Sequence, residues 1–440
     1  MNIARRLRYH AAVHLAGAPV LRWRQFRDVR RHRRRYRHGD GPLAPPLMGA
    51  YRMKRLLSQQ YLAGNYVNGV RKVAWFASGA PVEILQALGF FLYCPDNHAA
   101  LCGARSLAVD YCETAEAEGY SQDLCSYTRT DIGAMLRGAS PVGRLPRPDL
   151  IVCCNNICQT ILHWYTVVAD HYRVPLFVVD TPFLYGEAKP HQVDFVQRQL
   201  EELAATAERI SGRRLSFRRL RQATRLGRLA TELWLEILLR AKTRPSPISA
   251  FDAFINMGPI VALRGEPATV DFYRDLLAEI DRRIAGGVGA VTDERHRLLW
   301  DNLPIWYRLK WLAERLANHG ANVVISNYTY GWGELAPMMD EDRPMASAAR
   351  VYLHALLNRS VRTKVAVMRR MVDDFALDGV ILHSDRSCKP YSIGQIDQRA
   401  HLAGDLGVPA LMLESDHNDA RVFAENPVAT RLDAFLETLD

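Results

Sequence analysis

Three of the eight cysteines lie in polar loops between apolar segments. Cys125 lies in "DLCSYTR", Cys158 in "NNICQT" and Cys388 in "DRSCKP". A thiolate in such a loop can bind a metal, whereas a cysteine inside an apolar run is usually a small buried hydrophobe. Thiolates on three separate loops that meet in the fold would suit an iron–sulfur cluster in which one iron has no protein ligand.

The other cysteines are expected to pack in the core, with Cys154 left open as an alternative ligand. No two cysteines have the CxxC spacing of a zinc ribbon or a ferredoxin, and disulfides are not expected in a cytosolic chain of this size. Cys154 lies four residues before Cys158 and competes with it as a ligand. We expect four cysteines to be buried in the core: Cys94, Cys102, Cys112 and Cys153.

Polar residues near predicted strand ends are candidates for catalysis. Glu83 in "APVEILQ" opens a predicted helix near the carboxyl end of the first strand, where it could handle protons in an active cleft. Its structural alternative is a favourable charge at a helix N-terminus. Asn97 and His98 in "PDNHAA" follow the second strand and could touch a substrate, although His98 could equally be a structural histidine.

Four segments have the pattern strand, helix, strand, and they would position these residues. They span residues 71–100, 147–183, 296–330 and 377–419. Strands that alternate with helices of this length predict parallel, doubly wound sheets of the α/β class. In such sheets ligands bind beyond the carboxyl ends of the strands, where the connections diverge.

The second and fourth segments resemble each other. Asp149 precedes an apolar strand and Cys158 follows nine residues later, while Asp378 precedes a strand and Cys388 follows ten residues later. We therefore expect two Rossmann-like domains that face each other across a cluster site, with additional helices. The expected units are a basic arm and helix (1–65), a first α/β domain (66–200), a helical connecting region (201–290) and a second α/β domain (291–440).

The net charge of +10 is concentrated at the N-terminus. Residues 1–39 hold twelve arginines and a single acid, Asp28, so the rest of the chain is close to neutral. The run "RDVRRHRRRYRH" could bind nucleic acid, an acidic partner or a membrane surface, but its simplest interpretation is a solvated or frayed arm. A nearly neutral body makes a nucleic-acid-binding protein a poor expectation.

Hydropathy predicts no membrane partner. No apolar run approaches the length of about 18 residues that a membrane span needs. The N-terminal stretch "AAVHLAGAPVL" is short and is followed closely by arginines, which is not the pattern of a signal peptide. We therefore expect a cytoplasmic protein.

Three stretches carry a resemblance to a known family. "GYSQDLCSYTRTDIG", "PDLIVCCNNICQTILHWYTVVADHYRVPLFVVDTPF" and "DRSCKPYSIGQIDQRAHLAGDLGVPALMLESDHND" are similar to signature regions of the 2-hydroxyacyl-CoA dehydratase and benzoyl-CoA reductase family. The chain resembles a 2-hydroxyglutaryl-CoA dehydratase D-component subunit from about Lys72 to its C-terminus. The arginine-rich arm lies outside the resemblance.

The resemblance implies a cofactor and its ligands. Subunits of this family typically hold a [4Fe–4S] cluster with three cysteines, which correspond here to Cys125, Cys158 and Cys388. Cys158 is preferred to Cys154 because the family's cysteine directly precedes the acid or amide that opens the helix, here Gln159. The implied partners are an acyl-CoA substrate, a paralogous second subunit and an ATP-dependent iron–sulfur activator.

The resemblance also implies a reaction. An (R)-2-hydroxyacyl-CoA dehydratase reduces its thioester by one electron to a ketyl radical, which eliminates water. The alternatives are a benzoyl-CoA reductase-type subunit that reduces an aromatic ring, and a non-catalytic subunit that transfers electrons or acts as a scaffold. The chain has no G-x-x-x-x-G-K-[ST] loop, so it does not resemble an ATPase of the P-loop kind.

Overall fold

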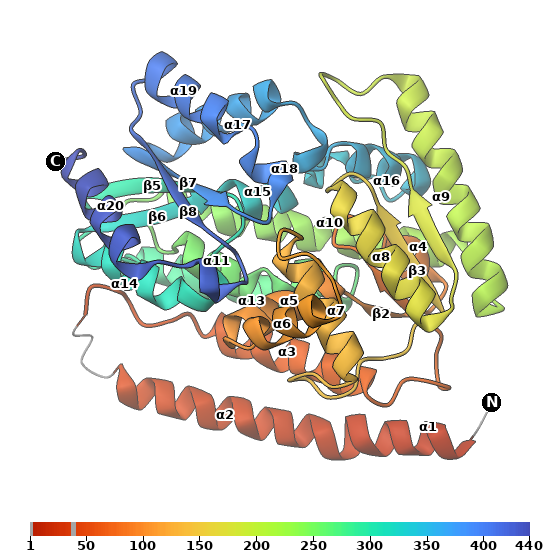
Figure 1. Ribbon diagram of the computed structural model, residues 1–440. Helices are drawn as coiled ribbons and strands as arrows, with labels where there is room; N and C mark the ends of the chain where they lie inside the picture. Colours follow the sequence, from red (N-terminus) through yellow and green to blue (C-terminus); the bar gives the residue numbers. More distant parts are fainter. Residues whose placement is uncertain (1–2, 37–40) are drawn as a thin grey trace.

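The structure is a computed structural model that describes residues 3–36 and 41–440. It contains two four-stranded sheets whose paired strands are all parallel, which confirms the α/β class (Figure 1). The first sheet consists of β1 (Val73–Phe76), β2 (Phe91–Tyr93), β3 (Leu150–Cys154) and β4 (Leu176–Val179). The second consists of β5 (His296–Asp301), β6 (Ala321–Ser326), β7 (Gly379–Asp385) and β8 (Ala410–Ser415).

Both sheets have the same topology. Their strand orders are β2-β1-β3-β4 and β6-β5-β7-β8. The connections therefore leave in opposite directions between β1 and β3, and again between β5 and β7. Such a reversal opens a crevice at the carboxyl ends of the two strands, where ligands bind in folds of this kind.

Burial in the first sheet follows its apolar runs. Every residue of β1 and β3 is buried, because these central strands are covered on both faces and "VAWF" and "LIVCC" offer continuous apolar side chains. β4 lies at the edge of the sheet, and Val178 is exposed there.

Helices cover the sheets and join the two units (Figure 1). The long α10 contacts α4 of the first unit and α15 of the second, and it packs along α13. The helices up to β4 are α1 (Ile3–His10), η1 (Ala11–Gly17), α2 (Ala18–Arg35), α3 (Gly49–Gly64), α4 (Glu83–Ala87), α5 (Pro95–Ala104), α6 (Ala108–Ala117), α7 (Ser126–Arg137) and α8 (Gln159–Tyr172). Those between β4 and β5 are α9 (Pro190–Ser211), α10 (Phe217–Leu239), η2 (Arg240–Lys242), α11 (Ala250–Asn256), α12 (Gly258–Ala262) and α13 (Pro267–Ala285). The remainder are η3 (Trp306–Arg308), α14 (Leu309–Asn318), α15 (Asn327–Gly333), η4 (Ala336–Met338), α16 (Pro344–Leu353), η5 (Leu356–Asn358), α17 (Val361–Phe375), α18 (Lys389–Ser392), α19 (Gln395–Asp405), η6 (Ala420–Val422) and α20 (Glu425–Glu437).

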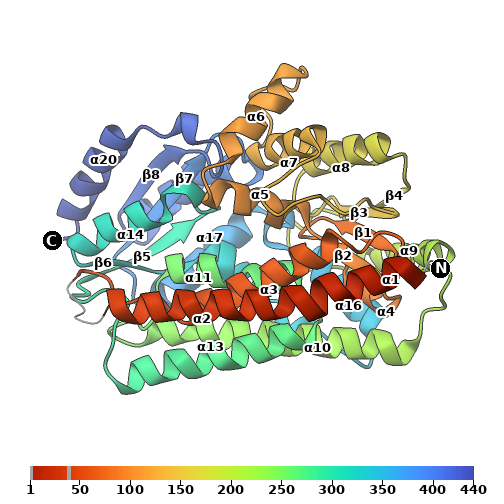
Figure 2. The ribbon, with the colours of Figure 1, turned by 90° about the horizontal axis from the view of Figure 1, so that it is seen from below.

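The N-terminal arm is an ordered helix along the body. α1, the π-helical η1 and α2 follow one another without a break, and α2 packs against α3 (Figure 2). On the inner side Val13 and His32 are buried, and the His32 Nδ1 atom lies 3.1 Å from the Tyr51 hydroxyl. The expectation of a frayed arm is therefore wrong for residues 3–36, because apolar and polar side chains spaced along one face dock this helix on α3. Most of the arginines are exposed, as a solvated arm requires.

The domain boundaries stay predictions. All strands of the first sheet fall within the expected segment 66–200, and all strands of the second fall within 291–440. Among the residues that the structure describes, no helix has the length and apolar content to cross a bilayer.

Candidate functional site

A cavity of about 390 Å³ lies between the carboxyl ends of the two sheets. Residues from the segments after all four inner strands line it: Ser78 after β1, Cys158 after β3, Leu303 after β5 and Cys388 after β7. The crevices that the strand orders create therefore face each other across one shared space.

Asn156 holds the loops around this cavity together. Its Nδ2 atom donates to the Gly79 carbonyl at 3.1 Å and to the Tyr352 carbonyl at 2.9 Å. A Cβ atom at residue 79 would lie 2.5 Å from the Asn156 side chain, so the close approach of the loops after β1 and β3 requires glycine there.

The three predicted cysteine ligands each precede a helix. Cys125 is the N-cap residue of α7, Cys158 that of α8 and Cys388 that of the single-turn α18. All three are half-buried and line the cavity. The first backbone N–H groups of a helix lack intrahelical acceptors and give this end a partial positive charge, which favours thiolates and other anions.

The other five cysteines are buried, and none of them lines the cavity. Cys154 is the last residue of β3, and its Sγ atom lies 4.0 Å from the Thr181 hydroxyl. It therefore completes the strand, as expected. Cys102 contacts His98, whose ring is buried away from the cavity, which agrees with the structural interpretation of that histidine.

A [4Fe–4S] cluster fits this set of donors. Burial raises the pKa of Cys158 to about 12 and holds the pKa of Cys388 well above its ordinary value. Nearby thiolates add to both shifts, because Cys125 acts on Cys158 and both of these act on Cys388. Thiolates that raise the pKa of neighbouring thiols need positive charge between them, and iron would supply it by displacing the thiol protons. No fourth cysteine lines the cavity, so a cluster held there would have one iron without a cysteine ligand.

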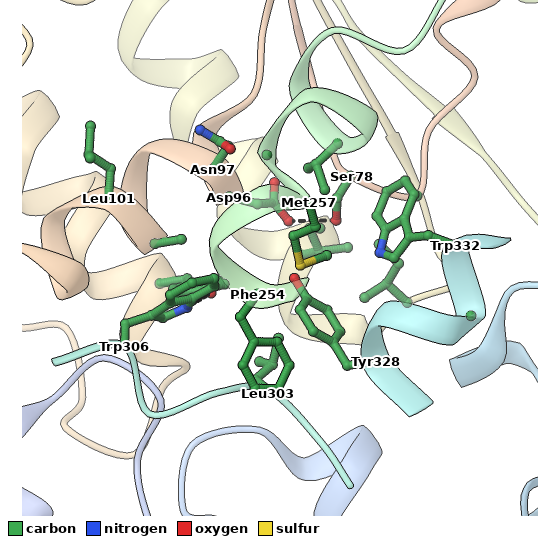
Figure 3. A pocket seen from close by; sticks show the side chains of 18 of the residues that line it. Ser78, Asp96, Asn97, Leu101, Phe254, Met257, Leu303, Trp306, Tyr328 and Trp332 are labelled. Atoms are coloured by element: carbon green, nitrogen blue, oxygen red, sulfur yellow. Dashed lines mark hydrogen bonds between the residues drawn. The ribbon is translucent and has the colours of Figure 1, made fainter. Parts of the chain in front are cut away.

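Asp96 provides an acid on the cavity wall, at the start of α5 (Figure 3). Its carboxylate accepts hydrogen bonds from the Ser78 hydroxyl and the Tyr165 hydroxyl, both at 3.0 Å. Removal from water raises the pKa of Asp96 to about 6, although these two hydrogen bonds oppose the shift. A carboxyl group with this pKa can both donate and accept a proton near neutral pH.

Apolar and aromatic side chains form most of the remaining wall. Figure 3 shows five of them around Asp96: Phe254, Met257, Trp306, Tyr328 and Trp332. Lys54 on α3 and Arg105 after α5 also line the cavity and are exposed, so they mark a basic rim. The space is thus apolar inside and positively charged at its edge.

A buried ionic network lies behind Cys125. The His417 Nδ1 atom lies 2.7 Å from an Asp385 oxygen, and its Nε2 atom lies 2.9 Å from the Ser126 hydroxyl and 3.8 Å from the Cys125 Sγ atom. Burial alone would lower the pKa of His417, but the carboxylates of Asp385 and Asp416 raise it well above its ordinary value. A cationic imidazole is therefore fixed beside one of the three thiols.

The same network joins the two units. Ser387 in the loop after β7 accepts a hydrogen bond from the Ser126 N–H at 3.1 Å and donates to Asp416. The donor atoms of Asp385, Asp416 and His417 lie within 4.8 Å of one another, a spacing that a metal site would also have. We interpret them as an ion network, because these atoms already bind one another and the two serines.

Glu83 does not line the cavity. It is the first residue of α4 and is buried, and its carboxylate binds the Arg264 guanidinium at 3.2 Å and the Tyr352 hydroxyl at 2.8 Å. Arg264 and Tyr352 do line the cavity. The Glu83 carboxylate thus lies behind Arg264 and Tyr352, which form part of the cavity wall. Its catalytic role stays a prediction.

Several polar residues of the site escaped the sequence analysis. Asp96 stands beside Asn97, which was proposed and does line the cavity. His417 and Asp416 belong to "SDHND", which begins with the last residue of β8 and is wholly buried. The signal that could have found them is a polar run directly after an apolar strand, at the end of the sheet where ligands bind.

Comparison with known proteins gives a consistent result. The family model for 2-hydroxyglutaryl-CoA dehydratase D-components matches residues 77–439. The chain is 28% identical to the (R)-2-hydroxyisocaproyl-CoA dehydratase alpha subunit of Clostridioides difficile, across 88% of this chain and 96% of that protein. It is 29% identical to the (R)-phenyllactyl-CoA dehydratase alpha subunit of Clostridium sporogenes, across 84% and 89%. It is also 29% identical to a benzoyl-CoA reductase subunit of Thauera aromatica, across 88% and 94%.

Proposed function

The chain belongs to the 2-hydroxyglutaryl-CoA dehydratase D-component family, and from this premise we propose that it is the iron–sulfur subunit of an (R)-2-hydroxyacyl-CoA dehydratase. The observation that carries the proposal is the meeting of Cys125, Cys158 and Cys388 at one cavity, while the five other cysteines point elsewhere. These three thiolates hold a [4Fe–4S] cluster, which supplies an electron and a Lewis-acidic iron when bound.

The cavity accepts the acyl group of a coenzyme A thioester. Its volume falls within the range of about 300–1,000 Å³ that is usual for small-molecule sites, and its aromatic walls suit an apolar acyl chain. Arg105 at the rim faces the solvent, where it attracts the phosphates of coenzyme A, whereas the Lys54 ammonium is already paired with Asp28. The apolar lining of the cavity disfavours water beside a reactive radical.

Asp96 handles the protons of the reaction. The thioester takes up one electron to become a ketyl radical anion, expels its 2-hydroxyl group, loses a β proton and returns the electron, so the net change is loss of water. Protonated Asp96 gives its proton to the departing hydroxyl group and then accepts the β proton, which restores its starting state. Ser78 and Tyr165 orient its carboxyl group.

Glu83 acts through its neighbours in this proposal. Its buried carboxylate neutralises Arg264 and receives the Tyr352 hydroxyl, so it fixes two side chains of the cavity wall. It is a positioning residue, and the proton-transfer role expected from the sequence passes to Asp96.

The proposed enzyme works with partners in the cytoplasm. Two dehydratase relatives are named as alpha subunits and the reductase relative is also named as a subunit, which supports a heterodimer with a second chain. Electrons of low potential come from a separate ATP-dependent iron–sulfur activator. A compartment that keeps thiols reduced suits three cysteines without disulfide partners.

A reductase of aromatic acyl-CoA thioesters is the second candidate. The relative named as a benzoyl-CoA reductase component is as similar to this chain as the dehydratase subunits are. The ring of Phe254, Trp306, Tyr328 and Trp332 would also suit a flat aromatic acyl group. The Asp96–Ser78 pair favours the dehydratase, since it offers a proton relay and a hydroxyl-binding group side by side.

The test is an anaerobic turnover assay of the co-expressed heterodimer with an ATP-driven activator. A panel of (R)-2-hydroxyacyl-CoA thioesters and benzoyl-CoA is followed by mass spectrometry. Loss of water from a 2-hydroxyacyl-CoA supports the dehydratase, and two-electron reduction of the aromatic ring supports the second candidate. An iron-loaded complex that converts neither class of thioester would contradict both proposed activities. The remaining interpretation would be a subunit that only transfers electrons.

A further inference from the structure

The outer face of the N-terminal helix carries an exposed apolar stripe. Six large hydrophobic residues between residues 3 and 26 are 48–77% exposed. We call them the outer stripe: Ile3, Leu7, Leu15, Val20, Trp23 and Phe26. Scattered apolar residues are normal on a protein surface, but a row of six along one helix needs an explanation.

The N-terminal helix carries apolar side chains on both its inner and its outer face. Its inner face holds Val13 and Gly17 against the body, and a Cβ atom at Gly17 would clash with Leu62. Ile3, Leu7 and Leu15 on the outer side are four and eight positions apart, and Val13 and Gly17 on the inner side are four apart. A spacing of four drifts by about 40° per step in an α-helix, and the wider turns of the π-helical η1 (Ala11–Gly17) counteract this drift.

The body holds this helix as a fixed platform. Asp28 receives the Lys54 ammonium at 2.8 Å, and Gln25 receives the Arg55 side chain at 2.7 Å. Figure 2 shows α1 and α2 running across one face of the molecule, outside α3 and α13. The outer stripe therefore faces away from the body.

Arginines flank the outer stripe. Residues 3–36 contain eleven arginines and one acid, Asp28, which is already paired with Lys54 and Arg27. Arg27 also lies over the Trp23 ring at 5.1 Å. Aromatic and aliphatic side chains bordered by arginine are the composition of helices that lie in the surface of an anionic membrane.

We propose that the outer stripe docks the protein on a membrane surface that contains anionic phospholipids. The apolar side chains enter the boundary between head groups and acyl chains, and the arginines bind lipid phosphates. A second copy of this chain does not fit, because two such helices would repel each other. A nucleic acid would use the arginines but leave the apolar stripe in water. The proposal does not depend on the enzymatic function, since residues 1–76 lie outside the family match.

Vesicle co-sedimentation tests the proposal on the full chain. One vesicle type contains phosphatidylcholine with phosphatidylglycerol, and the other contains phosphatidylcholine alone. We expect the protein to sediment with the anionic vesicles, with little binding to neutral vesicles, and to be released at high salt. Replacing Leu15, Trp23 and Phe26 together by Glu should weaken binding by roughly tenfold or more, because three apolar side chains no longer enter the membrane.

A matched control separates this effect from a general loss of surface hydrophobicity. Phe217 on α10 is 60% exposed, against 58% for Trp23, and Phe217→Glu should leave vesicle binding unchanged. Unchanged thermal melting of the triple variant verifies its fold. Equal binding to both vesicle types, or undiminished binding of the triple variant, would overturn the proposal. So would a second subunit that covers the stripe and blocks sedimentation, because the stripe would then be a subunit interface.

Discussion

The loops after β3 and β7 occupy equivalent places in two sheets of identical strand order, yet their surroundings differ. Each loop presents one cysteine as the N-cap of the following helix, Cys158 in the first unit and Cys388 in the second. Around Cys158 the first unit places the Asp96–Ser78 pair on the cavity wall. Near Cys388 the second unit places Asp385, which joins the buried network of His417 that reaches Cys125.

This difference suggests a division of labour between two halves of the same topology. The first unit turns its titratable carboxyl group toward the cavity, where a substrate would meet it. The second unit keeps its charges buried and connected, where they hold loops and thiols in place. A shared fold thus supplies two equivalent cysteine positions, while the residues next to them decide whether a half acts on substrate or supports the cluster.

Replacing Asp96 should have the largest effect on turnover. Asp96→Asn keeps the size of the side chain but cannot transfer a proton, so we expect the dehydration rate to fall by about 10²–10⁴-fold. Iron content should stay normal. Asp170→Asn, an exposed acid on α8, is the control and should be as active as the parent. A D96N variant with full turnover would remove the first unit's proposed role.

Replacing His417 should act on stability and on the cluster. His417→Gln leaves Asp385 buried without its cationic partner, which costs about 3–5 kcal/mol in the free energy of unfolding. His401→Gln is the matched control, because His401 lies at the same 2.7 Å from Asp405 but is 54% exposed. Its loss should cost well under about 1 kcal/mol. Chemical denaturation measures both, and equal costs would contradict the buried network.

The pH dependence of the unfolding free energy also tests the buried network of His417. The pKa of His417 is raised, so its contribution is complete below its unfolded pKa of about 6.5 and is lost as the pH rises through the folded value. The H417Q variant should lack this dependence on the alkaline side. A parent and a variant whose unfolding free energies change in parallel with pH would show that His417 is neutral.

The pH dependence of kcat/KM tests the role of Asp96 in the first unit. The pKa of Asp96 is about 6, and the proposed reaction needs its protonated form, so kcat/KM should fall as the pH rises through about 6. The residual activity of D96N should not fall over this pH range. If the activity of the parent rises through the same pH instead, Asp96 starts the reaction as a base.

Replacing Glu83 should have the smallest effect. Glu83→Gln removes the charge that fixes Arg264 and Tyr352, so we expect KM to rise by about tenfold while kcat changes little. Steady-state kinetics separate the two parameters. A fall of kcat by about 10²-fold or more would restore the direct proton-transfer role that the sequence suggested.

The sequence predicts the framework well, whereas the role of the three cysteines as cluster ligands stays a prediction. Apolar runs bounded by turns locate all eight strands, and the central strands β1 and β3 are buried throughout, as their continuous hydrophobic runs indicate. The preference for Cys158 over Cys154 agrees with the geometry, since Cys154 ends β3 inside the core and Cys158 opens α8 at the cavity.

Contacts between distant segments could not be predicted in this way. The bond between Ser126 and Ser387 joins residues 261 positions apart, and no local pattern indicates that α7 meets the loop after β7. Glu83 was placed at the correct helix end, but the residue that stands in front of it, Arg264, comes from a different segment. The inner face of the N-terminal helix was missed because arginines on the other faces dominate its composition.

Iron and acid-labile sulfide content, measured after anaerobic purification, tests the central claim most directly. The parent protein and Cys154→Ala should each contain about four iron and four sulfide per chain. Cys125→Ala, Cys158→Ala and Cys388→Ala should each lose most of both. A folded parent protein without iron, or a Cys154→Ala variant that loses iron while Cys158→Ala keeps it, would contradict the account.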